Sequence, residues 1–350
     1  MTSSPVITFV HPYLHEDSRR ADFPVFRRGH EAWGVQVPLR LKEAGLPIRL
    51  SSVVPESGIV VVHRDLLPDN FEPDERYFLV VMRGDRLPHP TANFEVVLNP
   101  LAAVDAGGQR RRYMPMFPQQ NLIARDVERG ERFETIVYMG APEQLHPMLR
   151  SAEFAEFLRA RGIEFRIETD PERWHDFSQV DAVIAVRPPG IDELRKPANK
   201  LINAWFAHTP AILGPEAAYR HHRRSEFDYL EVQTLEDAKA AVAALGKDPH
   251  LRKVIADSGA ARASDFTPEA TAERWRALLI DEVLPAATTW FGSASGRHVY
   301  TATRDLCLAR EYARNSGARA ALAFLRTRVA ARRRGEFRLV AGAPTPGKPT

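Results

Sequence analysis

Short runs of β-branched and aromatic residues alternate with longer polar stretches over most of the chain. In the first third, these runs occupy residues 6–10, 59–63, 78–83 and 94–99. Most positions in the last three runs are apolar, and strands that are apolar on both faces are buried on both faces. This pattern is typical of a parallel sheet that helices cover on both sides.

The same design returns after residue 134, with longer helices between the strands. Strands are predicted at residues 135–139, 165–168, 181–186, 210–213 and 228–232. Three helices follow: one is capped by Thr234, one spans residues 249–260, and one has Thr267 as its N-cap followed by Pro268. The alternation of strands and helices in both halves predicts an α/β protein with two doubly wound, Rossmann-like domains.

Four regions are expected along the chain. An N-terminal Rossmann-like domain covers residues 1–130 and a second covers residues 131–286, with the boundary in the polar stretch 125–132. A helical extension is expected over residues 287–335. The last segment, 336–350, is rich in Pro and Gly and is expected to be disordered.

Composition narrows the class of protein. Of the 350 residues, 44% are hydrophobic and 27% are charged, which is the balance of a soluble globular chain. The formal net charge of +3 is too small to favour a nucleic-acid partner. The single cysteine excludes an intramolecular disulfide framework. The first residues lack the features of a signal peptide, and no apolar run reaches the roughly 18 residues that span a bilayer. A cytoplasmic location is therefore expected.

The positive charge is concentrated at the end of the chain. Residues 301–350 contain eleven Lys and Arg against three Asp and Glu, so the rest of the chain carries a net charge of −5. One interpretation is a solvated helix face or a helix packed on the N-terminal domain. The other is an amphipathic helix over residues 317–334 that binds an anionic membrane surface, with Leu322, Leu325 and Val329 on its apolar side.

Residues 187–216 form the candidate binding segment. The segment begins where the strand at 181–186 ends, so it lies over the carboxyl edge of the second sheet, where open α/β sheets bind ligands. Pro197 suits the first turn of a helix, which puts Lys196 and Lys200 at its N-terminus, where free N–H groups stabilise a phosphate. Lys196, Asn199, Lys200 and Asn203 share one face of this helix. The alternative is an amphipathic helix whose lysines face water.

The sequence KPANKLINAWFAHTPAILGPE (196–216) resembles the donor-nucleotide segment of GT-B glycosyltransferases. In that family a helix, a turn of the type small residue–x–Pro and a short strand hold the diphosphate and ribose of a nucleotide sugar. The resemblance covers about residues 134–285, whereas the N-terminal half resembles the acceptor domain in architecture alone. It implies that Lys196 and Lys200 contact the diphosphate and that Glu216 accepts hydrogen bonds from the ribose. Asn199, Asn203, Gly140 and Arg187 are the other expected donor-site residues.

The segment departs from the family pattern at two places. Many retaining members carry a Glu–x7–Glu pair, and the corresponding residues here are Arg195 and Asn203. This departure weakens an assignment to the retaining branch. His208 stands where the turn usually has glycine, and it either contacts the ligand or ends the helix.

Candidates for a general base follow the strands of the N-terminal half. Asp85 and Asp65 are the leading candidates, because a carboxylate beside an arginine stays ionised and can accept a proton. His63 is a third, and His11 and His30 lie at the same edge of the sheet. Each of these side chains also has a plain structural interpretation, as a loop residue or a hydrogen-bonding partner.

The resemblance implies an enzyme that transfers a sugar from a nucleotide-diphosphate donor to a saccharide or lipid-linked acceptor. No cofactor or metal is expected, since a helix N-terminus and basic side chains stabilise the leaving diphosphate. A nucleotide-sugar 2-epimerase of the same architecture and a non-catalytic scaffold that binds sugar nucleotides are the alternatives. The donor sugar, the base, the acceptor, the stereochemical outcome and the oligomeric state stay open.

Overall fold

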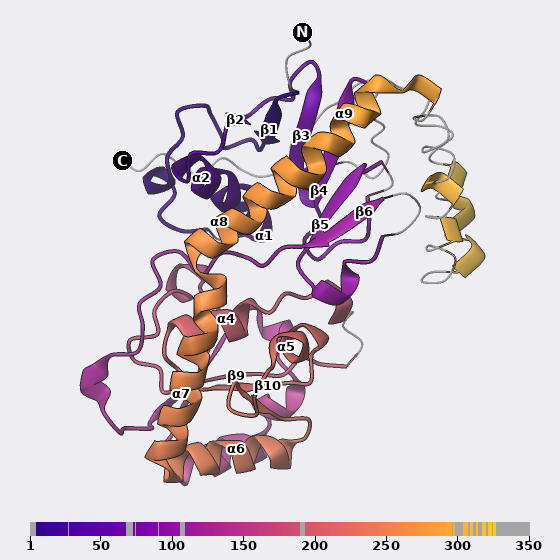
Figure 1. Ribbon diagram of the computed structural model, residues 1–350. Coiled ribbons are helices and arrows are strands. Elements are labelled where there is room, and N and C mark those ends of the chain that lie inside the picture. The colour runs from indigo at the N-terminus through magenta and orange to yellow at the C-terminus, as the bar shows by residue number, and fades with distance from the viewer. Residues whose placement is uncertain are drawn as a thin grey trace.

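The structure is a computed structural model of the chain. It describes residues 5–295 except 27, 68–72, 74, 90, 106–108 and 190–192, and beyond these residues 297, 304–306, 309–310, 313, 317–319, 321–323 and 325–326. Two α/β units lie one above the other, the N-terminal one at the top of Figure 1. The expected tail at 336–350 and most of the expected helix at 317–334 lie outside the described residues.

Six parallel strands form the N-terminal sheet, in the order β2-β1-β3-β4-β5-β6. The strands are β1 (Ile7–Val10), β2 (Ile48–Ser51), β3 (Gly58–His63), β4 (Tyr77–Met82), β5 (Phe94–Val97) and β6 (Arg110–Tyr113). The winding direction reverses between β1 and β3, so the switch point of this sheet lies at their carboxyl ends.

Five parallel strands form the C-terminal sheet, in the order β11-β10-β9-β7-β8. They are β7 (Thr135–Met139), β8 (Glu164–Glu168), β9 (Ala182–Ala185), β10 (Ala211–Leu213) and β11 (Leu230–Glu231). The switch point of this sheet lies between β7 and β9. The two topologies confirm the predicted fold class of two doubly wound domains.

Helices cover the sheets, and their ends follow from local sequence. They are α1 (Gly29–Gly34), α2 (Gln36–Glu43), α3 (Ala152–Arg159), α4 (Asn199–Phe206), α5 (Ala217–His222), α6 (Leu235–Lys247), α7 (Pro249–Ala263), α8 (Pro268–Ala277) and α9 (Leu284–Gly292). Thr234 and Asp237 form a reciprocal capping box at α6. Thr267 caps α8 and is followed by Pro268, as the sequence predicts. No helix among the described residues is long and apolar enough to cross a membrane.

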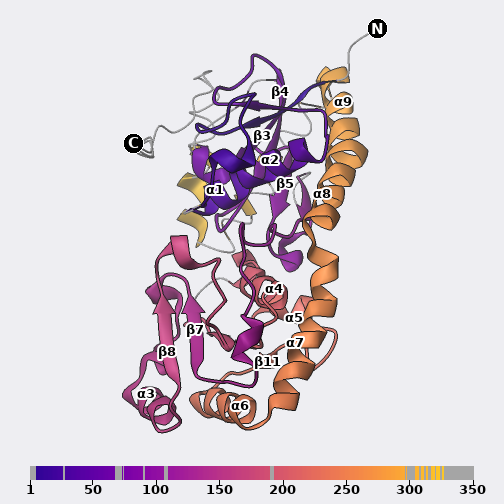
Figure 2. The same cartoon turned by 90° about the vertical axis from the view of Figure 1, so that its left-hand side faces the viewer.

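The N-terminal core is completed by residues from late in the chain. Trp275 is fully buried, and its ring lies 6.3 Å from that of Phe9 and 6.4 Å from that of Trp33. Figure 2 shows α8 and α9 running along the N-terminal unit. The sequence groups residues up to 286 with the second domain, but Trp275 and its apolar neighbours pack into the first. The chain therefore returns to the N-terminal domain soon after α7.

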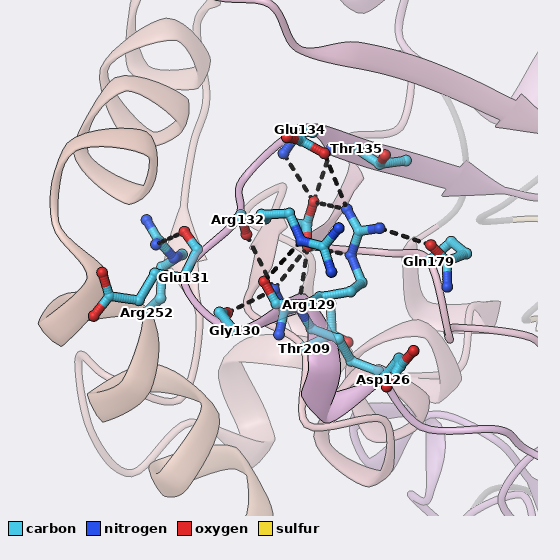
Figure 3. Close-up of polar contacts among 12 residues, drawn as sticks. Asp126, Arg129, Gly130, Glu131, Arg132, Glu134, Thr135, Gln179, Thr209 and Arg252 are labelled. Carbon is cyan, nitrogen blue, oxygen red and sulfur yellow. Dashed lines mark hydrogen bonds and ion pairs between the residues drawn. The ribbon is translucent and has the colours of Figure 1, made fainter.

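A buried ion-pair network fastens the linker between the domains to the C-terminal sheet (Figure 3). Asp181, which directly precedes β9, is 1% exposed. Its carboxylate accepts hydrogen bonds from the guanidinium groups of Arg129 at 2.6 Å and Arg125 at 2.9 Å, and from the backbone N–H groups of Glu134 and Thr135. Burial alone raises the pKa of Asp181, but these donors outweigh burial and lower it.

Replacing Asp181 by Asn leaves the guanidinium groups of Arg125 and Arg129 without their buried counter-charge, and the other carboxylate near Arg129, that of Glu134, is exposed and 3.9 Å away. We expect Asp181→Asn to reduce the free energy of unfolding of the C-terminal domain by about 3–5 kcal/mol, measured by urea unfolding. The pKa of Asp181 is lower in the folded than in the unfolded state. The stabilisation is therefore present above the pKa of Asp181 in the unfolded state, about 4. It is lost as the pH falls through the lower pKa of Asp181 in the folded state.

The matched control is Glu128→Gln, which removes an exposed carboxylate from the same linker and should change stability by less than about 0.5 kcal/mol. Equal urea midpoints for the Asp181 and Glu128 variants at pH 7 would contradict this account of the linker.

Candidate active site

A cleft of about 500 Å³ lies between the two domains, and residues of both switch points line it. Its N-terminal wall includes the carboxyl end of β3 and the turn after β4, and its C-terminal wall includes the ends of β7 and β9 and the first turn of α4. Eight of the ten site residues predicted from the sequence line this cleft: His63, Asp65, Asp85, Gly140, Arg187, Lys196, Asn199 and Lys200. Asn203 and Glu216 do not.

Lys200, in the first turn of α4, lies over the end of β7. Its ammonium group donates a hydrogen bond to the carbonyl of Met139 at 2.5 Å and lies 5.1 Å from the ring centroid of Tyr138. Gly140 has a φ of +151°, and a Cβ at this position would lie 3.0 Å from the Lys200 Nζ. The backbone conformation therefore favours glycine here, and the space that a Cβ would take is filled by the Lys200 Nζ and by the Tyr138 hydroxyl at 2.9 Å.

The electrostatics of this corner favour a bound anion. Burial lowers the pKa of Lys200 to about 7, and the positive charges of Arg187 and Lys196 act in the same direction against the opposing effect of Glu216. A cation held in such a place gains from an anion, because an opposite charge favours the protonated form. The first-turn N–H groups of α4 and its dipole add to this preference.

Arg187, just beyond β9, is oriented by Glu216. The Arg187 Nε donates to the Glu216 Oε2 at 2.7 Å, and the Nη1 donates to the Gln144 Oε1 at 3.3 Å. Glu216 is 2% exposed and is not part of the cleft wall. In this structure Glu216 thus positions the arginine, whereas the resemblance assigns it to the ribose.

Lys196 is held by the opposite domain. Its ammonium group forms an ion pair with the carboxylate of Asp85, and its backbone carbonyl accepts a hydrogen bond from the Asn99 Nδ2 at 3.2 Å. An expected ligand of the diphosphate and an expected base are therefore paired across the cleft. The cationic neighbour of Asp85 is Lys196 from the other domain, and not an arginine adjacent in the chain as the sequence predicts.

The remaining polar residues of α4 have separate roles. Asn199 lines the cleft, whereas the Asn203 Oδ1 accepts a hydrogen bond from the backbone N–H of Gln119 at 3.0 Å and so joins the domains. His208 follows α4 with a φ of +54° and lies away from the cleft, at the opposite edge of the sheet. Of the two interpretations of His208, the helix end is the one that the structure supports.

Three histidines gather at the N-terminal switch point: His11 after β1, His30 in α1 and His63 at the end of β3. The His11 Nδ1 accepts the backbone N–H of Tyr13 at 3.2 Å, so in a neutral ring the proton is on Nε2. That Nε2 lies 3.1 Å from the His30 Nδ1 and donates to it. Because the His30 Nδ1 accepts this hydrogen bond, a neutral His30 ring carries its proton on Nε2.

His63 is better suited to donate a hydrogen bond than to take a proton. Its Nδ1 accepts the backbone N–H of Asp65 at 3.2 Å, which leaves Nε2 as a donor beside Gly84. The side chain is 3% exposed, and burial lowers its pKa to about 4. Asp65 is bound at 2.5 Å to the Arg86 Nε, so Asp85 is the more accessible of the two carboxylates in the wall.

Among the residues that the structure describes, no group of three or more His, Cys, Asp or Glu side chains has the geometry to hold a metal ion. The C-terminal wall of the cleft instead concentrates positive charge, from Arg187, Lys196 and Lys200.

No protein-family model matches the sequence, and no curated protein matches it. Solved structures with a similar arrangement include sucrose-phosphate synthase from Thermosynechococcus elongatus, with 12% identity over 65% of this chain and 74% of that one and a TM-score of 0.44. AviGT4, a glycosyltransferase involved in avilamycin A biosynthesis, has 13% identity over 83% of this chain and 99% of its own, with a TM-score of 0.44. Anabaena HepE in complex with UDP has 11% identity over 79% and 100%, with a TM-score of 0.45. The identities are too low to transfer residue roles, so the site is interpreted from this chain's own contacts.

The depressed pKa of Lys200 predicts that binding of a nucleoside diphosphate takes up a proton. Lys200 is charged below about pH 7 and increasingly neutral above it, and an anion is attracted to the charged form. Affinity should fall between pH 7 and pH 9, by up to about tenfold per pH unit. Calorimetry in buffers of different ionisation enthalpy measures the proton uptake directly.

Lys200→Arg is the matched control, because an arginine stays charged over this range and should remove the pH dependence. An affinity of the unmodified protein that stays constant from pH 7 to pH 9, with no proton uptake, would contradict the assignment.

Proposed function

We propose that the protein is a glycosyltransferase that moves a sugar from a nucleotide-diphosphate donor to a saccharide or lipid-linked acceptor. The observation that carries this proposal is the convergence of Arg187, Lys196 and Lys200 on the switch point of the C-terminal sheet. These cations face a wall from the other domain that carries Asp85 and His63. A cleft with an anion site on one side and hydrogen-bonding and carboxylate groups on the other suits transfer between two bound substrates.

The donor diphosphate would lie at the first turn of α4. The Lys200 ammonium group lies beside Gly140 at this turn, and the helix N-terminus supplies N–H donors. When the bond between the sugar and the diphosphate breaks, negative charge develops on the diphosphate. Cations that are already in place stabilise that charge without reorganisation, which lowers the barrier. These residues supply the stabilisation that a divalent metal provides in other transferases, so we propose metal-independent transfer.

The acceptor would lie against the N-terminal wall. Its attacking hydroxyl loses a proton, and we assign Asp85 to accept it, since this carboxylate is 49% exposed at the cleft. Lys196 has to leave Asp85 to reach the diphosphate. Donor binding would therefore free the base at the moment when it is needed. His63, with its Nε2–H, is suited to bind a sugar hydroxyl.

The distribution of carboxylates favours transfer over the two alternatives. A 2-epimerase needs carboxylates that face the sugar from the donor side, and Glu216 on that side is buried against Arg187. A non-catalytic scaffold needs no carboxylates in the wall where the acceptor would lie, whereas Asp65 and Asp85 both line this wall.

Two substitutions should separate binding from chemistry. Lys200→Met should weaken nucleoside diphosphate binding by about 1–3 kcal/mol, the scale of a lost charge-assisted bond, as measured by calorimetry. Asp85→Asn should lower kcat for release of nucleoside diphosphate from the preferred nucleotide sugar by about 10²–10⁴, without weakening binding. The control is Lys247→Met, an exposed lysine on α6 that should change neither quantity. Full turnover by Asp85→Asn would remove Asp85 from the mechanism.

Turnover should survive EDTA, because the diphosphate is stabilised by side chains and a helix end. The measurement is the rate of nucleoside diphosphate release from a panel of nucleotide sugars, with and without chelator. A rate that is lost in EDTA and restored by magnesium or manganese would overturn the metal-independent part of the proposal.

A further inference from the structure

A second cavity, of about 450 Å³, opens at the other edge of the C-terminal sheet. Asp181, which precedes β9, lies in its wall, whereas Arg187, which follows β9, lies in the cleft. The linker between the domains, the turn after α4 and the first turns of α7 enclose it. Figure 3 shows part of this wall, where Arg252 of α7 lies beside Glu131 of the linker.

The buried side of this cavity carries more positive than negative charge. Among the described residues that line the cavity, Asp181 carries the one buried carboxylate. Arg129, which does not line the cavity, donates two hydrogen bonds to this carboxylate. Arg125 shares the same carboxylate and also donates to the backbone carbonyls of Gly130 and Arg132. One buried carboxylate therefore serves both guanidinium groups, and the other carboxylate near Arg129, that of the exposed Glu134, lies 3.9 Å away.

Arg252 adds a third guanidinium group. It is 9% exposed and donates to the backbone carbonyls of Leu245 and Glu131. In the part of the chain that the structure describes, no carboxylate lies within ion-pair distance of it. Burial lowers the pKa of Arg252 and the charge of Arg125 lowers it further, against the weaker pull of Asp181, Glu131 and Asp248.

Such an arrangement is costly without a counter-ion. Arginine does not give up its proton in proteins, so two like charges share the floor of a partly enclosed cavity. At the rim, His208 and His250 are exposed, and Lys253 is paired with Asp257 on the outer face of α7. The exposed Glu131 is the acidic group of the rim.

We propose that this cavity is a second anion site, separate from the cleft, that binds a phosphate group between Arg125 and Arg252, with His250 and Lys253 at its mouth. The phosphate is either inorganic or part of a small phosphorylated metabolite. Arg125 lies where the chain first crosses between the domains, and α7 leads to the second crossing. A bound phosphate would therefore tie together the two segments that connect the domains. The site does not depend on the proposed glycosyl transfer.

The test uses the full chain with Lys200→Met, which weakens anion binding in the cleft and leaves the second cavity intact. Inorganic phosphate and a hexose monophosphate are titrated by calorimetry at pH 7. We expect saturable binding of phosphate with a stoichiometry of one. Arg252→Met in the same background should weaken it about tenfold or more, the loss of a charge-assisted bond.

Because Arg252→Met removes a buried side chain, a second variant at the rim keeps the test independent of folding. The double variant His250→Ala/Lys253→Ala changes exposed side chains and should weaken phosphate binding at least threefold, whereas Lys247→Ala on α6 should not. Tighter binding of the hexose monophosphate than of phosphate supports a metabolite as the ligand, and the reverse order supports phosphate itself. Absence of saturable binding, or equal affinity in the rim variant and the Lys247 control, would overturn the proposal.

Discussion

The ion pair between Arg187 and Glu216 sets the electrostatics of the cleft. The two residues are 29 positions apart, and their contact at 2.7 Å fixes a guanidinium group at the carboxyl edge of the C-terminal sheet. Burial lowers the pKa of Lys200, and the positive charge of Arg187 lowers it further. Lys200 and Arg187 would repel each other in an apolar site, and the buried Glu216 carboxylate makes their proximity tolerable. Arg187 and Lys200 thus already carry the positive charge that an anion would need at this edge of the sheet.

Contacts between the domains give the cleft its second wall. Lys196 with Asp85, Asn99 with the Lys196 carbonyl, and Asn203 with the Gln119 N–H all join α4 or its approach to the N-terminal half. The α8–α9 segment also joins the two domains, because Trp275 of α8 packs into the core of the N-terminal domain. A ligand that competes for Lys196 changes one of these contacts and leaves the others. If the donor binds as we propose, substrate binding and domain contact are linked through the side chain of Lys196.

The periodicity of apolar residues predicted most of the strands, because a buried parallel strand has a continuous apolar run. The periodicity did not predict β2, whose four residues alternate between buried and more exposed positions. It also did not predict β6, whose sequence ArgArgArgTyr has no apolar run. The cationic cluster was predictable since a helix N-terminus, two lysines and a strand end are adjacent in the sequence. The pairing of Asp85 with Lys196 spans 111 residues, and the role of Glu216 depends on its burial. Neither is encoded in local sequence.

The proposed function depends on binding of the donor diphosphate at the first turn of α4. A crystal structure of the protein with a bound nucleoside diphosphate would test this placement. We expect phosphate oxygens within hydrogen-bond distance of the Lys200 Nζ and beside Gly140, with Lys196 released from Asp85. A diphosphate bound against the N-terminal wall or outside the cleft, with the pair of Lys196 and Asp85 intact, would contradict it.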